Sequence, residues 1–352
     1  MWEEEYIEAL KKEIQQNKEK AKGFMVSTIY IGGGTPSYID SKAIVSVLDT
    51  IKENYEIQEE AEITIEVNPG TVTKEKLEDY KKVGINRLSI GLQSTDNAIL
   101  KQIGRIHTYE EFLETYKLAR KIGFTNINID LMLALPNQTE EILGDSLQKV
   151  ISLDPEHISL YSLILEEGTP MTSFVEEGKI TLPTEEMERN MYWNTKRMLE
   201  QNGYIHYEIS NFAKPTKQSK HNQNCWNQKQ YLGFGLASHS YYHKTRYSNI
   251  TNLKDYIQSI GNGPVSANKT QNIHEIQTPE DEQKEYMLLG LRKIQGIAIS
   301  EFKNKFIQNP IYVFRKELDK LVKEELIEVD IDNIKLTDKG LDFANMVWKE
   351  FV

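Results

Sequence analysis

Short apolar segments alternate with amphipathic helical segments through the first half of the chain. Four apolar residues near the start recur at every fourth position, namely Trp2, Tyr6, Leu10 and Ile14. This spacing forms one apolar stripe, so the chain is predicted to begin with a helix over residues 2–16. Five strand-like runs follow, separated by helical segments: STIYIG, AEITIEV, INRLSIGLQ, NINIDLMLALP and EHISLYSLIL. Because these runs are apolar almost throughout, they predict a parallel sheet covered by helices, in a curved or closed barrel.

Two capping boxes mark predicted helix starts. Near the C-terminus, the alternation of strands and helices gives way to several helices followed by a hairpin. Thr108 and Glu111 form a capping box that opens a helix ending before Gly123. Thr278 and Asp281 form a second capping box, with a proline in the first helical turn. Further helical stretches lead to the segment LIEVDIDNIKLT, which predicts a hairpin with a polar tip. Helices followed by such a hairpin predict a small winged-helix-like module.

The start of the chain departs from a complete strand and helix repeat. A (β/α) repeat ordinarily begins with a strand, whereas this chain is predicted to begin with a helix. The first strand of the sheet is therefore expected to be missing. An unprotected sheet edge invites pairing, so a homodimer formed through that edge is an open alternative.

Composition narrows the class of protein. With 352 residues the chain can bury a large core without disulfide or metal staples. Its formal charge of -11 disfavours a general role on nucleic acid, where a basic face is expected. Its single cysteine, Cys225, excludes an internal disulfide framework and cannot alone hold an iron-sulfur cluster or zinc. No apolar run approaches the ~20 residues of a membrane span, and the N-terminus is too polar for a signal peptide, so we expect a cytoplasmic protein without membrane insertion.

Polar residues gather where the predicted strands end. In parallel barrels the ligand site lies at the carboxyl ends of the strands. Those ends give a glycine-rich turn, then Glu66, Gln93 and Asp130, with Arg105 a short helix beyond the third strand. Taken singly, most have a structural explanation: a tight turn, a surface carboxylate, a turn cap, or a surface ion pair worth less than ~1 kcal/mol. Asp130 is harder to explain in this way, because an unpaired carboxylate within an apolar strand is costly.

Together these residues suit a nucleoside that carries an amino acid. The segment YIGGGTPS contains Gly33, Gly34 and Thr35, and its glycines leave the backbone open to hydrogen-bond an amino-acid group. The Glu66 carboxylate can accept two hydrogen bonds from the vicinal hydroxyls of a ribose. The other polar side chains of the set can fix a carboxylate and an ammonium through charge-assisted hydrogen bonds.

Several ordered motifs resemble one known family. The segments STIYIGGGTPS, ITIEVNPG, RLSIGLQS with LKQIGRIHT, and NINIDLMLALPNQT resemble the radical S-adenosylmethionine (SAM) core of oxygen-independent coproporphyrinogen III oxidase-like proteins. Further along, EHISLYSLILEEGTPM, YEISNFAKP, SKHNQNCW and YLGFGLASHS resemble the haem-chaperone branch of that family, HemW. The resemblance runs from residue 2 to the C-terminus. It implies a partial (β/α)6 TIM-like barrel of radical SAM type, here without its first strand, followed by a specific C-terminal region.

The resemblance also implies a division of the chain and a set of binding residues. It implies a radical SAM core over residues 1–175, a connecting region over 176–275 and a winged-helix-like domain over 276–352. His221, which heads the segment HNQNC, matches the HNxxY motif proposed to bind haem in this branch. The residues implied to contact S-adenosyl-L-methionine are Gly33, Gly34, Thr35, Glu66, Gln93, Arg105 and Asp130.

The cluster ligands of the family are the main departure. The family holds a [4Fe-4S] cluster with a Cys-x3-Cys-x2-Cys motif after its first strand, and this sequence contains only one cysteine. Cluster binding by this chain is therefore not expected, since the iron needs thiolate ligands. An N-terminal truncation would explain the missing cysteines and the missing strand together. A naturally shortened paralogue is the alternative, and the genomic DNA just upstream would distinguish the two.

Five further positions differ from the family pattern, among them Ser238, where alanine is frequent. The tyrosine of HNxxY is Cys225 in this chain. Three positions at which the family commonly has glycine hold larger residues, namely Ala134, Thr216 and Ala237. These changes weaken the inference about haem more than the inference about the fold.

The resemblance favours a haem chaperone that binds SAM and haem and delivers haem to haemoprotein acceptors. One alternative is an oxygen-independent coproporphyrinogen III oxidase, which decarboxylates propionate groups. Another is a clusterless binding or regulatory protein that docks a protein partner through its C-terminal module. Nucleic acid is not an expected partner, given the acidic total charge.

The single cysteine generates a first prediction. After reconstitution with iron, sulfide and a strong reductant, this chain should form no 5′-deoxyadenosine from SAM, because it cannot supply three thiolates to a cluster. Chromatography of the reaction mixture is the measurement. Detection of 5′-deoxyadenosine above a protein-free control would contradict the expectation.

Overall fold

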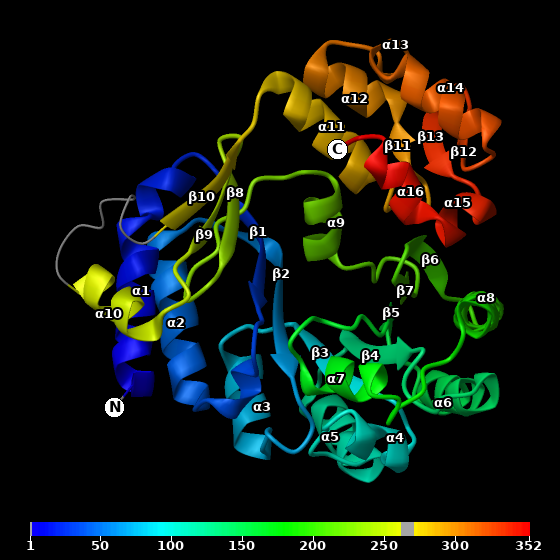
Figure 1. Cartoon of the computed structure of the whole chain (residues 1–352). Coiled ribbons are helices and arrows are strands. Elements are labelled where there is room, and N and C mark those ends of the chain that lie inside the picture. Colours follow the sequence, from blue (N-terminus) through cyan, green and yellow to red (C-terminus); the bar gives the residue numbers. More distant parts are fainter. Residues whose placement is uncertain (1, 262–270) are drawn as a thin grey trace. The chain divides into compact units, whose positions relative to one another are not determined.

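The computed structural model describes residues 2–261 and 271–352 (Figure 1). The chain divides into two compact units. We call them the barrel unit, made of Ile29–Ser41 and Glu62–Ser219, and the terminal unit, made of Met1–Thr28, Lys42–Ala61 and Lys220–Val352. The three regions expected from the sequence stay a prediction, and residues 262–270 of the second region lie outside the described residues.

The main sheet is a curled half-barrel with the strand order β1-β2-β3-β4-β5-β7-β6. Strands β2 to β5 pair in parallel, and β7 and β6 add an antiparallel edge. The strands are β1 (Val26–Ile31), β2 (Ile57–Val67), β3 (Arg87–Gln93), β4 (Ile127–Leu133), β5 (His157–Ser162), β6 (Ile205–Glu208) and β7 (Asn211–Ala213). The five strands predicted from apolar runs are therefore confirmed, and so is the mixed α/β fold. The antiparallel edge was not predicted, because β6 and β7 are too short to show a pattern.

Helices cover the sheet in the barrel unit, and Figure 1 shows α3, α5, α6 and α8 beside the strands. The helices are η2 (Pro36–Tyr38), α3 (Lys74–Lys82), α4 (Asn97–Gln102), α5 (Tyr109–Ile122), α6 (Glu140–Ser152), α7 (Pro170–Glu176) and α8 (Glu185–Gln201). Every residue of β3 is buried, including the polar Arg87, Ser89 and Gln93, as expected for a strand of a sheet covered by helices. The capping box of Thr108 and Glu111 is present at the start of α5, as predicted.

In the terminal unit, α1 (Trp2–Gln16) packs against α10 (Leu253–Gly261), as Figure 1 shows. A buried carboxylate on α1, Glu13, joins three other segments. It accepts hydrogen bonds from the Gly235 backbone N–H (2.8 Å), the Asn249 side-chain amide (2.7 Å) and the Tyr256 hydroxyl (2.6 Å). Burial raises the pKa of Glu13, and these donors oppose that shift. The carboxylate is therefore an internal tie of the unit, with its hydrogen-bonding capacity used by protein groups.

The rest of the terminal unit contains two small sheets, β10-β9-β8 and β11-β13-β12. The predicted C-terminal hairpin is confirmed, because β12 pairs antiparallel with β13. The sheet β10-β9-β8 was not predicted from the sequence. None of the helices in the described ranges is long and apolar enough to cross a membrane. The remaining elements are η1 (Lys18–Ala21), α2 (Ser41–Asn54), α9 (Lys220–Trp226), β8 (His239–Tyr242), β9 (Thr245–Asn249), β10 (Gln271–Ile276), α11 (Pro279–Gly290), β11 (Ile297–Ala298), α12 (Ile299–Phe306), α13 (Pro310–Val313), α14 (Arg315–Lys323), β12 (Ile327–Val329), β13 (Asn333–Leu336), α15 (Asp338–Asp342) and α16 (Ala344–Lys349).

Three positions that hold a larger residue where the family commonly has glycine share one backbone feature. Ala134, Thr216 and Ala237 have φ angles of 59°, 67° and 57°. This left-handed region suits glycine and is unfavourable for residues with a Cβ, most of all for a β-branched threonine. At all three positions this chain therefore adopts a backbone conformation that glycine adopts without strain.

Buried histidine in the barrel unit makes stability depend on pH. Burial lowers the pKa of His206 from 6.5 to about 4, so the unfolded chain binds a proton at a higher pH than the folded one. The free energy of unfolding should be highest above pH 6.5 and should fall as the pH drops toward 4, by roughly 3 kcal/mol in all. Urea unfolding at several pH values measures this slope. His206→Gln should reduce this slope and leave the contribution of the buried His157, whereas the exposed His274→Gln should not change it. Parallel curves for all three proteins would contradict the prediction.

Candidate functional site

The glycine turn after β1 is built around the carboxylate of Glu66. The Gly33 backbone N–H donates to Glu66 Oε2 (3.2 Å), and the Tyr30 hydroxyl donates to Oε1 (2.9 Å). A Cβ on Gly32 would lie 2.8 Å from Glu66 Oε1, so a larger residue there would displace the Glu66 carboxylate. Gly33 and Gly34 have φ angles of +83° and +60°, and a Cβ there would meet no atom within 4 Å. The backbone of these two glycines is therefore open to a ligand.

Asn68, just beyond β2, connects three segments of the barrel unit. Its side-chain N–H donates to Thr35 Oγ1 (3.1 Å), and its Oδ1 atom accepts from Arg105 Nη1 (3.2 Å). Its backbone N–H donates to the hydroxyl of Ser37 (3.0 Å). The predicted site residues did not include Asn68. Its position at a strand end was visible in the sequence, but its partners were not.

Gln93 reaches this group of side chains through an irregularity at the end of β3. The register between β3 and β4 shifts between Gly91 and Gln93, and Gln93 has a left-handed φ of 70°. A Cβ on Gly91 would lie 3.0 Å from Gln93 Nε2 and 3.3 Å from Asn68 Oδ1. The bulge thus turns the Gln93 side chain toward Asn68, into space that glycine leaves open.

Asp130, on β4, accepts hydrogen bonds from Ser89 Oγ (3.2 Å) and Asn128 Nδ2 (2.8 Å). Burial raises the pKa of Asp130, and the hydrogen bonds and the nearby Arg87 guanidinium oppose that shift. Burial also lowers the pKa of Arg105, and attraction to Asp130 opposes that change. The carboxylate is thus hydrogen-bonded by protein groups and lies within electrostatic reach of an arginine of the set.

A buried histidine supports Asp130 from the next strand. His157 Nδ1 lies 2.6 Å from Asn128 Oδ1, and its Nε2 lies 2.8 Å from the Tyr207 hydroxyl. An amide oxygen can only accept, so Nδ1 carries the proton and Nε2 accepts from the tyrosine. Burial holds the pKa of His157 well below its usual value, so the ring is neutral. This chain of hydrogen bonds orients Asn128, which in turn donates to Asp130.

His221 belongs to the terminal unit, where it lies on α9. Its Nδ1 atom lies 3.2 Å from the hydroxyl of Thr28. Cys225 follows one helical turn later on the same helix and is half-buried. Burial raises the pKa of the Cys225 thiol, which therefore stays protonated near neutral pH and is a poor metal ligand. Of the two residues, the histidine is better suited to bind iron.

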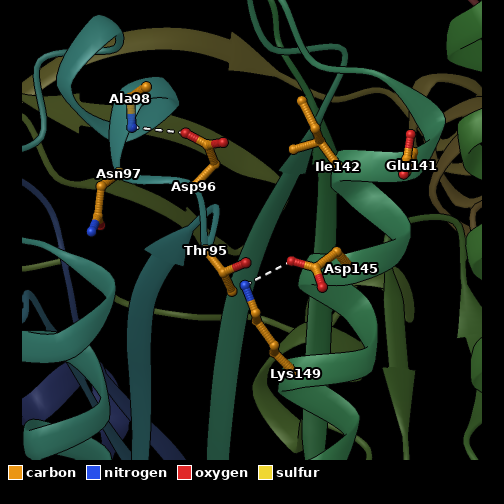
Figure 2. A pocket seen from close by; sticks show the side chains of 8 residues that line it. All are labelled: Thr95, Asp96, Asn97, Ala98, Glu141, Ile142, Asp145 and Lys149. Atoms are coloured by element: carbon orange, nitrogen blue, oxygen red, sulfur yellow. Dashed lines mark hydrogen bonds and ion pairs between the residues drawn. The ribbon is translucent and has the colours of Figure 1, made fainter.

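A separate pocket of about 530 Å³ lies between the turn after β3 and helix α6. Figure 2 shows Lys149 directed at Asp145, and Asp96 at the backbone of Ala98. These contacts are an ion pair of 2.7 Å and a helix cap of 2.7 Å, so Asp96, Asp145 and Lys149 already have partners. No predicted site residue lines this pocket, whose lining is Thr95, Asp96, Asn97, Ala98, Glu141, Ile142, Asp145 and Lys149. We therefore do not assign it a function.

Comparison with known proteins identifies the class to which this fold belongs. The Radical SAM superfamily profile matches residues 2–150, and the HemN C-terminal domain profile matches residues 277–343. The solved structure of coproporphyrinogen III oxidase (HemN) from Escherichia coli, a radical SAM enzyme, is similar with a TM-score of 0.84 and 26% identity. That match covers 99% of this chain and 83% of the oxidase chain. The half-barrel is therefore of the radical SAM class.

Two curated relatives are similar over nearly their whole length. The heme chaperone HemW of Lactococcus lactis is 35% identical over 348 residues, covering 99% of this chain and 89% of the relative. The heme chaperone HemW of Bacillus subtilis is 36% identical over 350 residues, covering 99% and 91%. The chain belongs to the HemW family.

Membership in this class implies SAM and a [4Fe-4S] cluster as cofactors. The strand ends fit the nucleoside: the glycine backbone is open, and carboxylate and guanidinium groups converge beside it. For a cluster, whose irons take thiolate ligands, the sequence printed above contains one cysteine. Within the described ranges, no three His, Cys, Asp or Glu residues are grouped so that they could hold a metal ion. We therefore derive no step through a cluster.

Asn68 generates a prediction about this site. Asn68→Ala should raise the dissociation constant for SAM about tenfold, because Thr35 and Arg105 lose the amide that positions both. Asn68→Asp keeps the acceptor for Arg105 and loses the donor to Thr35, so its effect should be smaller. Isothermal titration calorimetry is the measurement, with the exposed Asn202→Ala as the matched control. Equal affinity in all four proteins would rule out this role for Asn68.

Proposed function

We propose that this chain binds SAM at the strand ends of the half-barrel, binds haem through His221, and delivers haem to haemoprotein acceptors. The observation that carries the proposal is the similarity, over 89% and 91% of their lengths, to relatives named heme chaperone HemW. Haem is the cargo in this proposal, and the nucleoside is a bound cofactor. A homodimer and a cytoplasmic location stay predictions.

The recognition of SAM follows from the donors and acceptors that the site offers. A carboxylate can accept about four hydrogen bonds. Glu66 accepts one from Tyr30 at Oε1 and one from Gly33 at Oε2. Two remain for the vicinal hydroxyls of a ribose. In the proposal, the backbone of Gly33 and Gly34, with Thr35 beside it, receives the methionine part. When bound, SAM supplies a sulfonium carbon as an electrophilic or reducible centre.

The amino-acid end of SAM carries an ammonium and a carboxylate, and the site holds complementary groups. We assign Asp130 to the ammonium, Arg105 to the carboxylate, and Gln93 to a supporting hydrogen bond. Partial burial of Asp130 and Arg105 supports this assignment, because charge-assisted hydrogen bonds are stronger where water is excluded. The proposal that this chain performs no radical chemistry rests on its single cysteine.

Haem binding is assigned to the imidazole of His221. Its Nδ1 atom is next to Thr28 Oγ1, so Nε2 is the nitrogen proposed to coordinate the iron. A hydrogen bond on the other ring nitrogen fixes the orientation of a ligating histidine and tunes its basicity. Cys225, which stands at the tyrosine position of the HNxxY motif, is not assigned as a ligand, because its thiol stays protonated.

A second candidate function is oxygen-independent coproporphyrinogen III oxidation. The structural similarity to the Escherichia coli oxidase, with a TM-score of 0.84, favours this alternative. Decarboxylation of propionates would require a reconstituted cluster and turnover of coproporphyrinogen, whereas a chaperone binds haem without turnover. Anaerobic incubation with coproporphyrinogen, assayed for loss of carbon dioxide, distinguishes the two functions.

The haem assignment generates a prediction for His221. His221→Ala should raise the dissociation constant for haem at least about tenfold and shift the Soret band, because the iron loses an axial ligand. Cys225→Ser should leave both unchanged, since the protonated thiol is not a ligand. Titration with ferric haem, followed by absorbance, is the measurement, and His274→Ala is the control. Unchanged haem binding in His221→Ala would refute the assignment.

A further inference from the structure

Residues 279–349, from α11 to α16, contact the end of α9, the helix that carries His221, and we call them the C-terminal module. The guanidinium of Arg292 lies between two indole rings, 4.4 Å from the centroid of Trp226 and 4.9 Å from that of Trp348. Trp226 is the last residue of α9, whereas Trp348 lies on α16. Tryptophan is the best aromatic partner for a cation, and the planar guanidinium of arginine stacks on aromatic faces. We call this arrangement the Trp226–Arg292–Trp348 stack.

The turn that follows α9 is also held by the C-terminal module. Gln228 is buried and has a left-handed φ of 52°. Its side-chain N–H group donates to the carbonyl of Glu282 (3.1 Å) and to the carboxylate of Glu285 (2.6 Å). The ammonium of Lys305 donates to Gln228 Oε1 (2.6 Å). Residues of α11 and α12 therefore bind both the N–H group and the oxygen of this amide.

A further contact joins the same turn to the residue beside Arg292. The ammonium of Lys293 donates to Asn227 Oδ1 at 2.6 Å. Lys293 is half-buried, which makes an unpaired ammonium costly at this position. Three consecutive residues after the HNQNC segment, from Trp226 to Gln228, therefore have partners in the C-terminal module. This concentration of contacts distinguishes the α9 end from an ordinary surface turn.

The other contacts of α9 lie within the same unit, at the start of β1. His221 Nδ1 is 3.2 Å from Thr28 Oγ1, and Asn224 Nδ2 donates to Ser27 Oγ (3.2 Å). A helix of seven residues is too short to be stable alone, so its position depends on such contacts. Helix α9 is thus held by the first strand along its length and by the C-terminal module at its end.

We propose that Arg292 and Trp348 are positioning residues for haem binding, which orient His221 by clamping the end of α9 through Trp226. This inference rests on the proposed haem-binding function. An axial ligand must present its nitrogen along a narrow direction, and a loosely held helix populates that orientation only part of the time. The apparent affinity for haem falls in proportion to the population of the competent orientation.

These contacts give the C-terminal module a role in haem binding, and we call them the clamp. Docking of the module keeps α9 in its binding orientation. Loss of the stack allows α9 to leave this orientation, which lowers the affinity for haem. An acceptor protein that disturbs the module would therefore promote release without touching the iron.

Two variants remove the stack, and two others serve as matched controls. Arg292→Met keeps the length of the side chain and removes the cation, whereas Trp348→Leu removes the aromatic face. Trp348→Phe keeps an aromatic face and should bind haem like the wild type. Arg315→Met removes an arginine of the same module whose ion pair with Asp319 is exposed, so it should have no effect.

The first measurement is ferric haem titration followed by the Soret band. Arg292→Met and Trp348→Leu should raise the dissociation constant on the order of tenfold and broaden or shift the Soret band. The second measurement is amide hydrogen exchange of residues 220–226 in the haem-free protein, which should be faster in both variants. SAM affinity and the midpoint of thermal unfolding should stay close to wild type, which excludes general unfolding as the cause.

The outcomes separate the inference from the function on which it rests. If the wild type binds no haem, or His221→Ala binds it as tightly as the wild type, the proposed function fails and the clamp fails with it. If the wild type binds through His221 and the stack variants keep wild-type haem affinity, only the clamp is overturned. Faster exchange with unchanged haem affinity also overturns it, because the contacts would then be structural only.

Discussion

Two hydrogen bonds of the Asn68 side-chain amide hold the polar residues at the strand ends in place. A carboxamide offers a donor and an acceptor in one plane, so a single residue can hold Thr35 on one side and Arg105 on the other. The absence of a side chain at Gly91 leaves room for Gln93 to join them. Parallel strands bring these residues to one edge of the sheet, and the amide determines their spacing.

The two units hold their functional residues in place by different physical means. In the barrel unit the strands themselves are rigid, and a buried neutral His157 supports Asp130 through Asn128. In the terminal unit the helix that carries His221 is short, so side chains from distant segments hold it. Rigidity in the first case comes from backbone pairing and in the second from aromatic and amide contacts.

Much of the fold was predictable because its elements are long or carry local signals. Strands β1 to β5 were predicted from their apolar runs, and the helix at Thr108 shows its own capping box. The sheet β10-β9-β8 was missed because its strands, HSYY, TRYSN and QNIHEI, are short and contain few aliphatic residues. The left-handed backbone at Thr216 shows the limit of residue-based reasoning, since threonine does not indicate that conformation.

By itself the sequence determined the family, the first five strands with the helices between them, and which residues lie at the ends of those strands, because these properties depend on local pattern. Only the tertiary structure decided which of those residues touch. Asn68 and the Trp226–Arg292–Trp348 stack have no local signature, since their partners are tens of residues away along the chain. Hydrogen bonds and aromatic contacts act over a few ångströms of space, and separation along the chain does not reveal that distance.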